Sequence, residues 1–181
     1  TMRRTGARTP AMAQARFERE VSAYVRSRGR RPIVWDEVLE LGAPEGVTVM
    51  VWRDAQFVRR AVEAGFDTIA APYAHTYFDY GESIGEHEPI SIVAPTTLDD
   101  VAAYHRIWDG LDSPRLLGGQ FQLWSEYLRT GATVEYFGFP RGSLVAEQLW
   151  AGEPKSGWGP EDLAVPTARL TAMGINWRRF D

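Results

Sequence analysis

The amino-acid sequence predicts an α/β protein in which parallel strands alternate with helices. Four short apolar segments, each bounded by Gly, Pro or charged residues, have the length and composition of buried strands. A segment with the apolar spacing of a helix follows each of them, and another precedes the first. Because this alternation is typical of parallel strands joined by right-handed crossovers, the sequence predicts four strand–helix units after a first helix. The predicted strands cover residues 32–35, 47–52, 68–73 and 116–124.

The helices are predicted from apolar periodicity and from the residues that begin and end them. In the first helix, Phe17 and Val21 belong to a set of apolar residues with helical spacing. Asp54 has the position and chemistry of an N-cap, and Gly65 ends the helix that Asp54 begins. The predicted helices cover residues 10–28, 38–45, 55–64, 97–108, 133–151 with an interruption near Pro140, and 160–173. Residues 74–96 lack periodicity and form a predicted long loop, a kind of segment that is usually functional or disordered.

The composition is that of an ordinary globular protein and excludes several kinds of site. The 181 residues include no Cys, which excludes disulfides, thiolate catalysis and cysteine metal sites. The net charge is −4 and the basic residues are scattered, so neither nucleic acid nor a membrane is indicated as a partner. The three histidines lack the spacing of metal ligands, so no metal or other cofactor is predicted. They are His75, His87 and His105. A single lysine among 20 basic residues is typical of a GC-rich bacterial genome, whereas the compartment stays unknown.

Tryptophans are frequent, and four of the seven lie on or beside predicted helices, where packing is their expected role. These four are Trp108, Trp150, Trp158 and Trp177.

At or shortly after the end of each predicted strand, an aromatic residue is followed by a carboxylate one or two residues further on. The four endings are Trp35-Asp36-Glu37, Trp52-Arg53-Asp54, Tyr77-Phe78-Asp79 and Trp124-Ser125-Glu126. One such ending is more often part of a core, but four at the carboxyl ends of parallel strands indicate a ligand site. Aromatic rings pack on the apolar C–H faces of a pyranose, and carboxylates accept hydrogen bonds from its hydroxyl groups. The sequence therefore predicts a carbohydrate site. Its predicted residues are Trp35, Trp52, Tyr77, Asp79, Trp124 and Glu126.

Alternation alone leaves two architectures open, half of an eight-unit barrel or a complete small open sheet. Further motifs lie at residues 35–37, 49–53, 77–80, 88–89, 118–127, 135–141, 146–150 and 170–179. In this order and spacing they resemble glycoside hydrolase family 20, the β-N-acetylhexosaminidases. The resemblance implies that residues 1–181 are the carboxyl-terminal part of a (β/α)8 TIM barrel.

The resemblance also implies a reaction and a role for each residue of the predicted site. In this family the 2-acetamido oxygen of the substrate attacks the anomeric carbon. Tyr77 would hold that oxygen by a hydrogen bond. The three tryptophans would enclose the acetamido methyl group and the sugar face, and Asp79 and Glu126 would bind the distal hydroxyl groups of a terminal N-acetylhexosamine.

One departure from the family pattern is serious, because the catalytic Asp-Glu pair that follows His-x-Gly-Gly is missing. Asp36-Glu37 is the only Asp-Glu dipeptide, but its context matches the next strand of the family. We therefore expect the chain alone to be inactive and to associate with itself or with the missing half of the barrel. The alternative function is a non-catalytic carbohydrate-binding module that keeps the pocket without the general acid.

Overall fold

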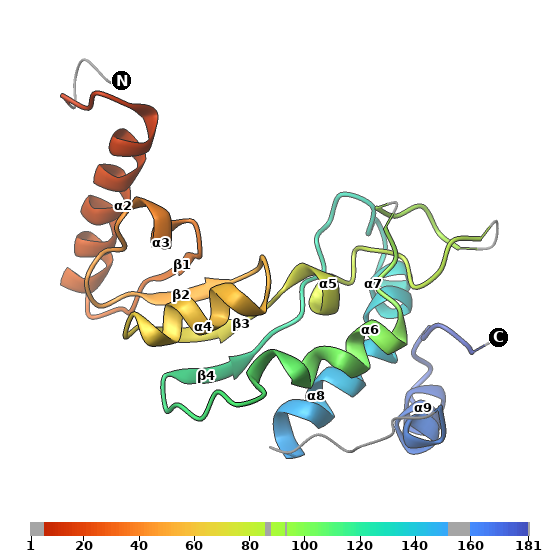
Figure 1. The fold of residues 1–181 in the computed structure, drawn as a ribbon. Coiled ribbons are helices and arrows are strands. Elements are labelled where there is room, and N and C mark those ends of the chain that lie inside the picture. Colours follow the sequence, from red (N-terminus) through yellow and green to blue (C-terminus); the bar gives the residue numbers. More distant parts are fainter. Residues whose placement is uncertain (1–5, 86–87, 93, 152–159, 181) are drawn as a thin grey trace. The chain divides into compact units, whose positions relative to one another are not determined.

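The computed structural model describes residues 6–85, 88–92, 94–151 and 160–180, which group into two compact units. Unit 1 comprises Thr1–Ala70 with Gly110–Gly118, and unit 2 comprises Ala71–Asp109 with Gly119–Asp181. Each unit has buried apolar side chains of its own. The ribbon shows the strands of unit 1 and the helices of unit 2 (Figure 1).

Unit 1 is built on a parallel sheet with the strand order β1-β2-β3-β4. The strands are β1 (Ile33–Trp35), β2 (Thr48–Val51), β3 (Asp67–Ala70) and β4 (Leu116–Gly119), whose last residue is assigned to unit 2. Val49 faces Val34 on one side and Thr68 on the other, and it is fully buried. The carbonyl oxygen of Arg115 accepts a 2.7 Å hydrogen bond from Thr68 N, next to the start of β4. Because the strands are parallel and in register, the carboxyl ends of β1, β2 and β3 meet at one edge of the sheet.

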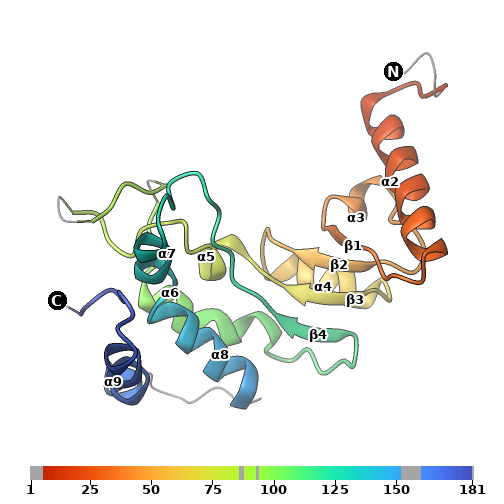
Figure 2. The same cartoon turned by 180° about the vertical axis from the view of Figure 1, so that it is seen from behind.

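The helices of unit 1 begin where the sequence predicts them. In α2 (Pro10–Ser27), Thr9 is the N-cap and accepts a hydrogen bond from Met12 N. In α4 (Ala55–Glu63), Asp54 is the N-cap, and its Oδ1 accepts from Gln56 N at 2.9 Å. Helix α4 buries Val58 and Ala61 and lies along β2 and β3 in both ribbon views (Figures 1 and 2). The short helix α3 (Val38–Leu41) ends at Gly42, whose φ of 82° is readily available only to glycine.

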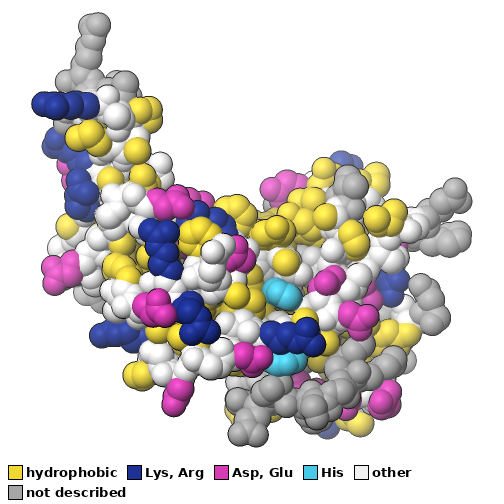
Figure 3. All heavy atoms as spheres, viewed as in Figure 1, with side chains coloured by type: hydrophobic (Ala, Val, Ile, Leu, Met, Phe, Trp, Pro, Cys, Tyr) yellow, Lys and Arg dark blue, Asp and Glu magenta, His cyan; other side chains and the backbone are white. Residues whose placement is uncertain are grey.

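Helix α2 exposes apolar as well as charged side chains. Figure 3 shows hydrophobic and basic side chains beside one another along it. Four of its large apolar residues are exposed, namely Met12, Phe17, Val21 and Tyr24. The helical spacing predicted from the sequence is thus real, but on α2 it marks a face that the rest of unit 1 leaves uncovered.

Unit 2 is mainly helical. Its elements are α5 (Tyr73–Thr76), α6 (Leu98–Ala102), η1 (Ala103–Trp108), α7 (Gly131–Gly138), α8 (Arg141–Ala151), η2 (Pro160–Leu163) and α9 (Ala164–Ala172). Helix α6 starts with a capping box formed by Thr97 and Asp100. The break predicted near Pro140 separates α7 from α8, because proline has no N–H to donate to the preceding turn. Helices α6 and α8 lie side by side in both ribbon views.

Two predicted strands end earlier than expected. The strand predicted over residues 68–73 stops at Ala70, since Pro72 N-caps the short helix α5 and its carbonyl oxygen accepts from Thr76 Oγ1 at 2.9 Å. The strand predicted over residues 116–124 stops at Gly119, after Gly118 with a φ of 139°. Beyond it only an isolated bridge between Gln122 and Tyr77 remains.

The expectation that the tryptophans of the helices pack is wrong for Trp150, which is 94% exposed on α8. Trp177 is buried, and the ring of Trp108 packs edge-on against Tyr104 at 4.8 Å. Trp158 and His87 lie outside the described residues.

Candidate functional site

Two of the six predicted site residues belong to unit 1, at the carboxyl edge of its sheet. Trp35 closes β1 and keeps 36% of its surface exposed, while Trp52 follows β2 and is half-buried. The indole Nε1 of Trp52 donates a hydrogen bond of 3.1 Å to Glu37 Oε1. The carboxylate of Glu37 therefore fixes the orientation of a ring that the sequence predicts to face a sugar.

Asp36, the neighbour of Glu37, is engaged with Arg53. Its side chain is fully buried, and its Oδ1 accepts from Arg53 Nε at 3.0 Å. Arg53 also donates to the carbonyl oxygen of Asp36 and to Glu40 Oε1, and its guanidinium lies 3.7 Å from the centre of the Phe57 ring. Burial raises the pKa of the Asp36 carboxyl, and the charge of Arg53 opposes that rise. Asp36 thus pairs with an arginine and Glu37 with an indole, which gives both members of this dipeptide a part in holding the edge of the sheet together.

The other four predicted residues belong to unit 2, where two irregular segments run alongside each other. Phe78 N donates to Gln122 O at 2.9 Å, and Gln122 N donates to Thr76 O at 2.8 Å. These bonds bring the rings of Tyr77 and Trp124 to a centroid distance of 6.1 Å with an interplanar angle of 56°. Tyr77 is half-buried and Trp124 is 39% exposed, so the pair presents aromatic surface to solvent.

Asp79 is the deepest carboxylate of the predicted site. It is 2% exposed, and its Oδ1 has no hydrogen-bond partner within the described part of the chain. The pKa of Asp79 is raised to about 6, chiefly by burial and also by the negative charge of the exposed Glu126, whereas a hydrogen bond from its own backbone and the charge of Arg141 oppose the rise. A buried polar oxygen costs free energy until a donor satisfies it. Asp79 is therefore suited to accept a hydrogen bond from the hydroxyl group of a ligand.

Comparison with known proteins identifies the family to which the chain belongs. Residues 1–153 match glycosyl hydrolase family 20, catalytic domain. The chain belongs to this family. It is 31% identical over 182 residues to a beta-hexosaminidase of Porphyromonas gingivalis, an alignment that covers 97% of this chain and 23% of the relative. A beta-hexosaminidase of Arthroderma benhamiae is 28% identical over 180 residues, with 86% and 29% covered.

The solved structures of family 20 enzymes share the fold of this chain. The exo-beta-N-acetylglucosaminidase of Vibrio harveyi in complex with N-acetylglucosamine superposes with a TM-score of 0.85 at 24% identity, covering 98% of this chain and 29% of that one. These similarities confirm the predicted family and the fold class, an α/β chain with strand–helix units of a TIM barrel. The bacterial origin inferred from composition fits the bacterial relatives. This family 20 chain spans about a quarter of the length of the curated relatives that it matches.

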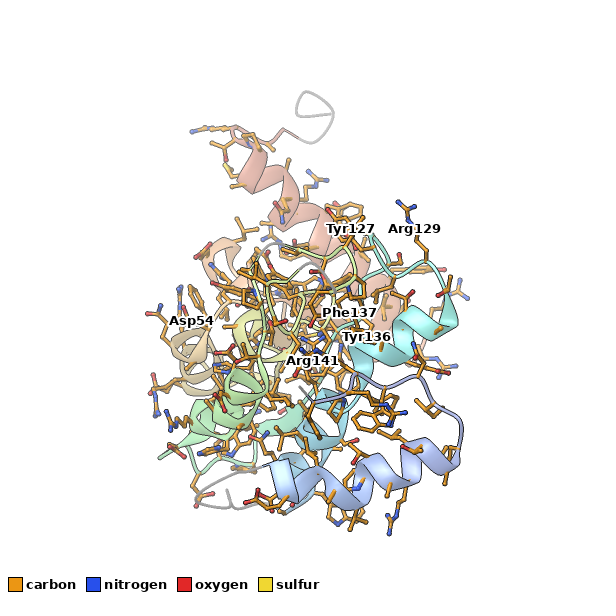
Figure 4. The ribbon with its side chains drawn as sticks, turned by 90° about the vertical axis from the view of Figure 1, so that its right-hand side faces the viewer. Asp54, Tyr127, Arg129, Tyr136, Phe137 and Arg141 are labelled. Atoms are coloured by element: carbon orange, nitrogen blue, oxygen red, sulfur yellow. The ribbon has the colours of Figure 1, made fainter. Side chains whose placement is uncertain are left out.

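Sequence reasoning did not single out Arg141 as a functional residue of this family 20 chain. Arg141 opens α8, is 1% exposed and lies beside Phe137 of α7 (Figure 4). Its guanidinium donates to the carbonyl oxygens of Phe78, Tyr80, Thr96 and Phe137. The sequence signal that could have identified Arg141 is its helical spacing. It lies three and four residues before Leu144 and Val145, on the buried face of α8.

A second buried arginine, Arg178, lies among acidic residues of the long loop. Its Nε donates to Glu88 Oε1 at 2.8 Å, and its Nη1 donates to Glu82 Oε1 at 3.2 Å. Tyr136 and Ser83 also donate to Glu88. Although burial raises the pKa of Glu88, the hydrogen bonds from Ser83 and Arg178 bring it below the ordinary value. An ion network thus connects Glu82 and Glu88, two residues of the loop predicted over 74–96, to Arg178.

His75, the histidine next to the predicted site, has its Nδ1 2.6 Å from the carbonyl oxygen of Asp100. Within residues 6–85, 88–92, 94–151 and 160–180, no group of three His, Asp or Glu side chains is arranged to hold a metal ion. No helix in that same part of the chain is both long and apolar enough to cross a membrane.

Proposed function

We propose that this chain carries the sugar-binding residues of an exo-β-N-acetylhexosaminidase that works by substrate assistance. The observation that carries the proposal is the combination, in unit 2, of a buried carboxylate with an unpartnered oxygen, Asp79, and the aromatic pair Tyr77 and Trp124. An aromatic surface beside an unsatisfied acceptor matches the two needs of a pyranose ring, apolar contact and hydrogen-bond acceptors. Membership of family 20 supports the same reading.

In the proposed reaction, the carbonyl oxygen of the substrate's 2-acetamido group forms a bond to the anomeric carbon. The bond from that carbon to the leaving oxygen breaks, and a general acid protonates the leaving group. Water then opens the resulting ring and restores the acetamido group, with net retention. The Tyr77 hydroxyl donates to the acetamido oxygen and holds it in line for attack.

The remaining five residues bind the sugar. For each of Trp35, Trp52 and Trp124 we propose a contact with the acetamido methyl group or with one face of the sugar ring, as membership of family 20 suggests. Asp79 and Glu126 accept from the distal hydroxyl groups of the sugar. Because those groups are free only at the non-reducing end of a glycan, this contact restricts the enzyme to terminal residues.

The general acid of the proposed reaction comes from outside residues 1–181. The sequence holds no His-x-Gly-Gly motif, and its one Asp-Glu dipeptide is tied to Arg53 and Trp52. A non-catalytic carbohydrate-binding module is the second candidate function, and the missing motif is the observation that favours it.

The two candidates are separated by assaying the full-length protein that contains these residues with an aryl N-acetyl-β-glucosaminide. The enzyme proposal expects release of the aryl group with retention at the anomeric carbon and an upstream His-x-Gly-Gly-Asp-Glu motif in the coding sequence. Binding of N-acetylglucosamine without any turnover, measured by calorimetry on the same preparation, would favour the binding module. Absence of both would contradict the carbohydrate site itself.

A further inference from the structure

The buried guanidinium of Arg141 makes a hydrogen bond with each of its five N–H groups, and every acceptor is a backbone carbonyl. Nη2 donates to Phe78 O at 3.0 Å and to Phe137 O at 2.8 Å. Nη1 donates to Tyr80 O at 3.0 Å and to Thr96 O at 2.8 Å, and Nε donates to Phe137 O at 3.2 Å. An arginine has five donors in a fixed planar arrangement, so this side chain is fully satisfied.

Two of these acceptors, Phe78 and Tyr80, flank Asp79 in the sequence. The guanidinium also lies 4.5 Å from the centre of the Phe78 ring, and Phe78 is fully buried. The backbone is therefore held on both sides of Asp79 by a single rigid group. The Phe78 carbonyl belongs to the peptide unit directly before Asp79, and the Tyr80 carbonyl belongs to the second peptide unit after it. Arg141 thus restrains the backbone from which the Asp79 side chain starts, without bonding to the carboxylate.

Neighbouring charges explain why a cation is tolerated at this depth. Glu82 Oε2 lies 3.9 Å from Arg141 Nε, and it is 8% exposed. Burial lowers the pKa of Arg141 and the charge of Glu82 limits the fall, so that the pKa is about 10 and the guanidinium stays protonated at neutral pH. An aliphatic side chain in its place would leave the four carbonyl groups without their donors.

We infer that Arg141 is a positioning residue for sugar recognition, because it holds the backbone on both sides of Asp79 and so sets the place of the carboxylate that accepts from the sugar. This inference rests on the proposed function, which assigns Asp79 to the distal hydroxyl groups. It predicts that Arg141 and Asp79 act on the substrate as one unit although their side chains are not bonded.

The test is a double-mutant cycle in the full-length protein, with Arg141→Lys, Asp79→Asn and the double variant. Lysine keeps the charge but carries its three donors on one nitrogen, so it cannot span the same carbonyl groups. We expect Arg141→Lys to raise KM for an aryl N-acetyl-β-glucosaminide about tenfold with a smaller change in kcat. In the Asp79→Asn background the same substitution should raise KM less than about twofold, since coupled residues are not additive.

The matched control is Arg178→Lys, which alters a second buried arginine of unit 2 that bonds to Glu82 and Glu88 instead of to the segment around Asp79. It should lower Tm while leaving KM within about twofold of wild type. A purely structural role for Arg141 would give equal effects of Arg141→Lys in both backgrounds, and that result would overturn the inference. A wild-type protein with no turnover would instead contradict the proposed function, so the two failures are distinguishable.

A measurement on the unsubstituted protein covers the case in which Arg141→Lys does not fold. With ¹⁵N-labelled arginine, saturation with N-acetylglucosamine should shift the Arg141 Nη1 and Nη2 signals, because these nitrogens donate to Tyr80 O and Phe78 O on the two sides of Asp79 and these bonds tighten on binding. A derivative that lacks the distal hydroxyl groups should shift them much less. Equal shifts with both sugars, or no shift with either, would overturn the inference.

Discussion

Trp52 donates its indole N–H to Glu37 across 3.1 Å. Glu37, which by its Asp-Glu context most resembles a catalytic acid, therefore already accepts a hydrogen bond. A hydrogen bond of this kind needs an oxygen but not a charge. We therefore expect Glu37→Gln, which keeps an oxygen in the same place, to leave kcat of the full-length enzyme within about threefold of wild type. Glu37→Leu removes the acceptor and should raise KM about tenfold, since the indole N–H of Trp52 then loses its hydrogen bond to Glu37.

Steady-state kinetics of both variants check this prediction. Loss of a general acid lowers kcat by roughly 10²- to 10⁴-fold, and a decrease of that size in Glu37→Gln would identify Glu37 as the acid after all.

The Tyr77 hydroxyl is predicted to stabilise the transition state more than the bound substrate. Removing one such donor in a dry site costs on the order of 3 kcal/mol. Tyr77→Phe retains the ring that packs 6.1 Å from Trp124, so KM should move little while kcat falls about a hundredfold. If the substitution changed KM alone, Tyr77 would be an ordinary binding residue and substrate assistance would lose its main support in this chain.

The raised pKa of Asp79 makes stability depend on pH in a defined direction. The carboxyl titrates at about 6 in the folded protein and at 3.8 ordinarily, so between these values the folded state holds the proton more tightly. The stabilisation that comes from this tighter proton binding is complete below about pH 4 and is lost as the pH rises through 6. The free energy of unfolding differs by about 3 kcal/mol between these two limits. Asp79→Asn cannot ionise, so its stability relative to wild type should increase from about pH 4 to about pH 6 and stay constant above that.

Urea unfolding of both proteins from pH 4 to pH 8, followed by tryptophan fluorescence, measures this difference. A gap between the two proteins that stayed constant over the whole range would mean that Asp79 is not the titrating group.

The isolated 181-residue chain is expected to self-associate. Strands β1 and β4 are the edges of the sheet, and each exposes a large apolar side chain, Ile33 at 53% and Leu117 at 52%. Unpaired strand edges beside exposed apolar surface favour association with other chains. Size-exclusion chromatography with light scattering should find dimers or larger species. A monomer that unfolds cooperatively over a wide concentration range would contradict this expectation.

Local sequence signals predicted much of the fold, because caps and breaks depend on neighbouring residues. Asp54 and Pro140 mark helix boundaries in the structure as they do in the sequence. The strands predicted over 68–73 and 116–124 are too long because Pro72 and Gly118, which lie close to where the regular pairing ends, occur within otherwise apolar segments. Propensity is a weak guide wherever a turn residue interrupts an apolar pattern.

The sequence singles out the residues of the candidate site but not the side chains that support them. Tyr77 and Trp124 stand out because they are aromatic residues near the ends of predicted strands. Arg141 does not, since its acceptors at Thr96 and Phe78 lie 45 and 63 residues away along the chain. A contact of that kind exists only in the folded protein and leaves no periodic signal.

The ion network of Arg178 has a consequence for how this family varies. Its two carboxylate partners, Glu88 and Glu82, lie 90 and 96 positions upstream, and all three side chains are largely withdrawn from water. Replacing the arginine alone would remove the cation that both carboxylates bind. Replacing one acid alone would leave the arginine with one of its two carboxylate partners. Lineages that lose Arg178 should therefore lose both acids as well, and this joint inheritance should be visible across relatives whatever glycan each of them cuts.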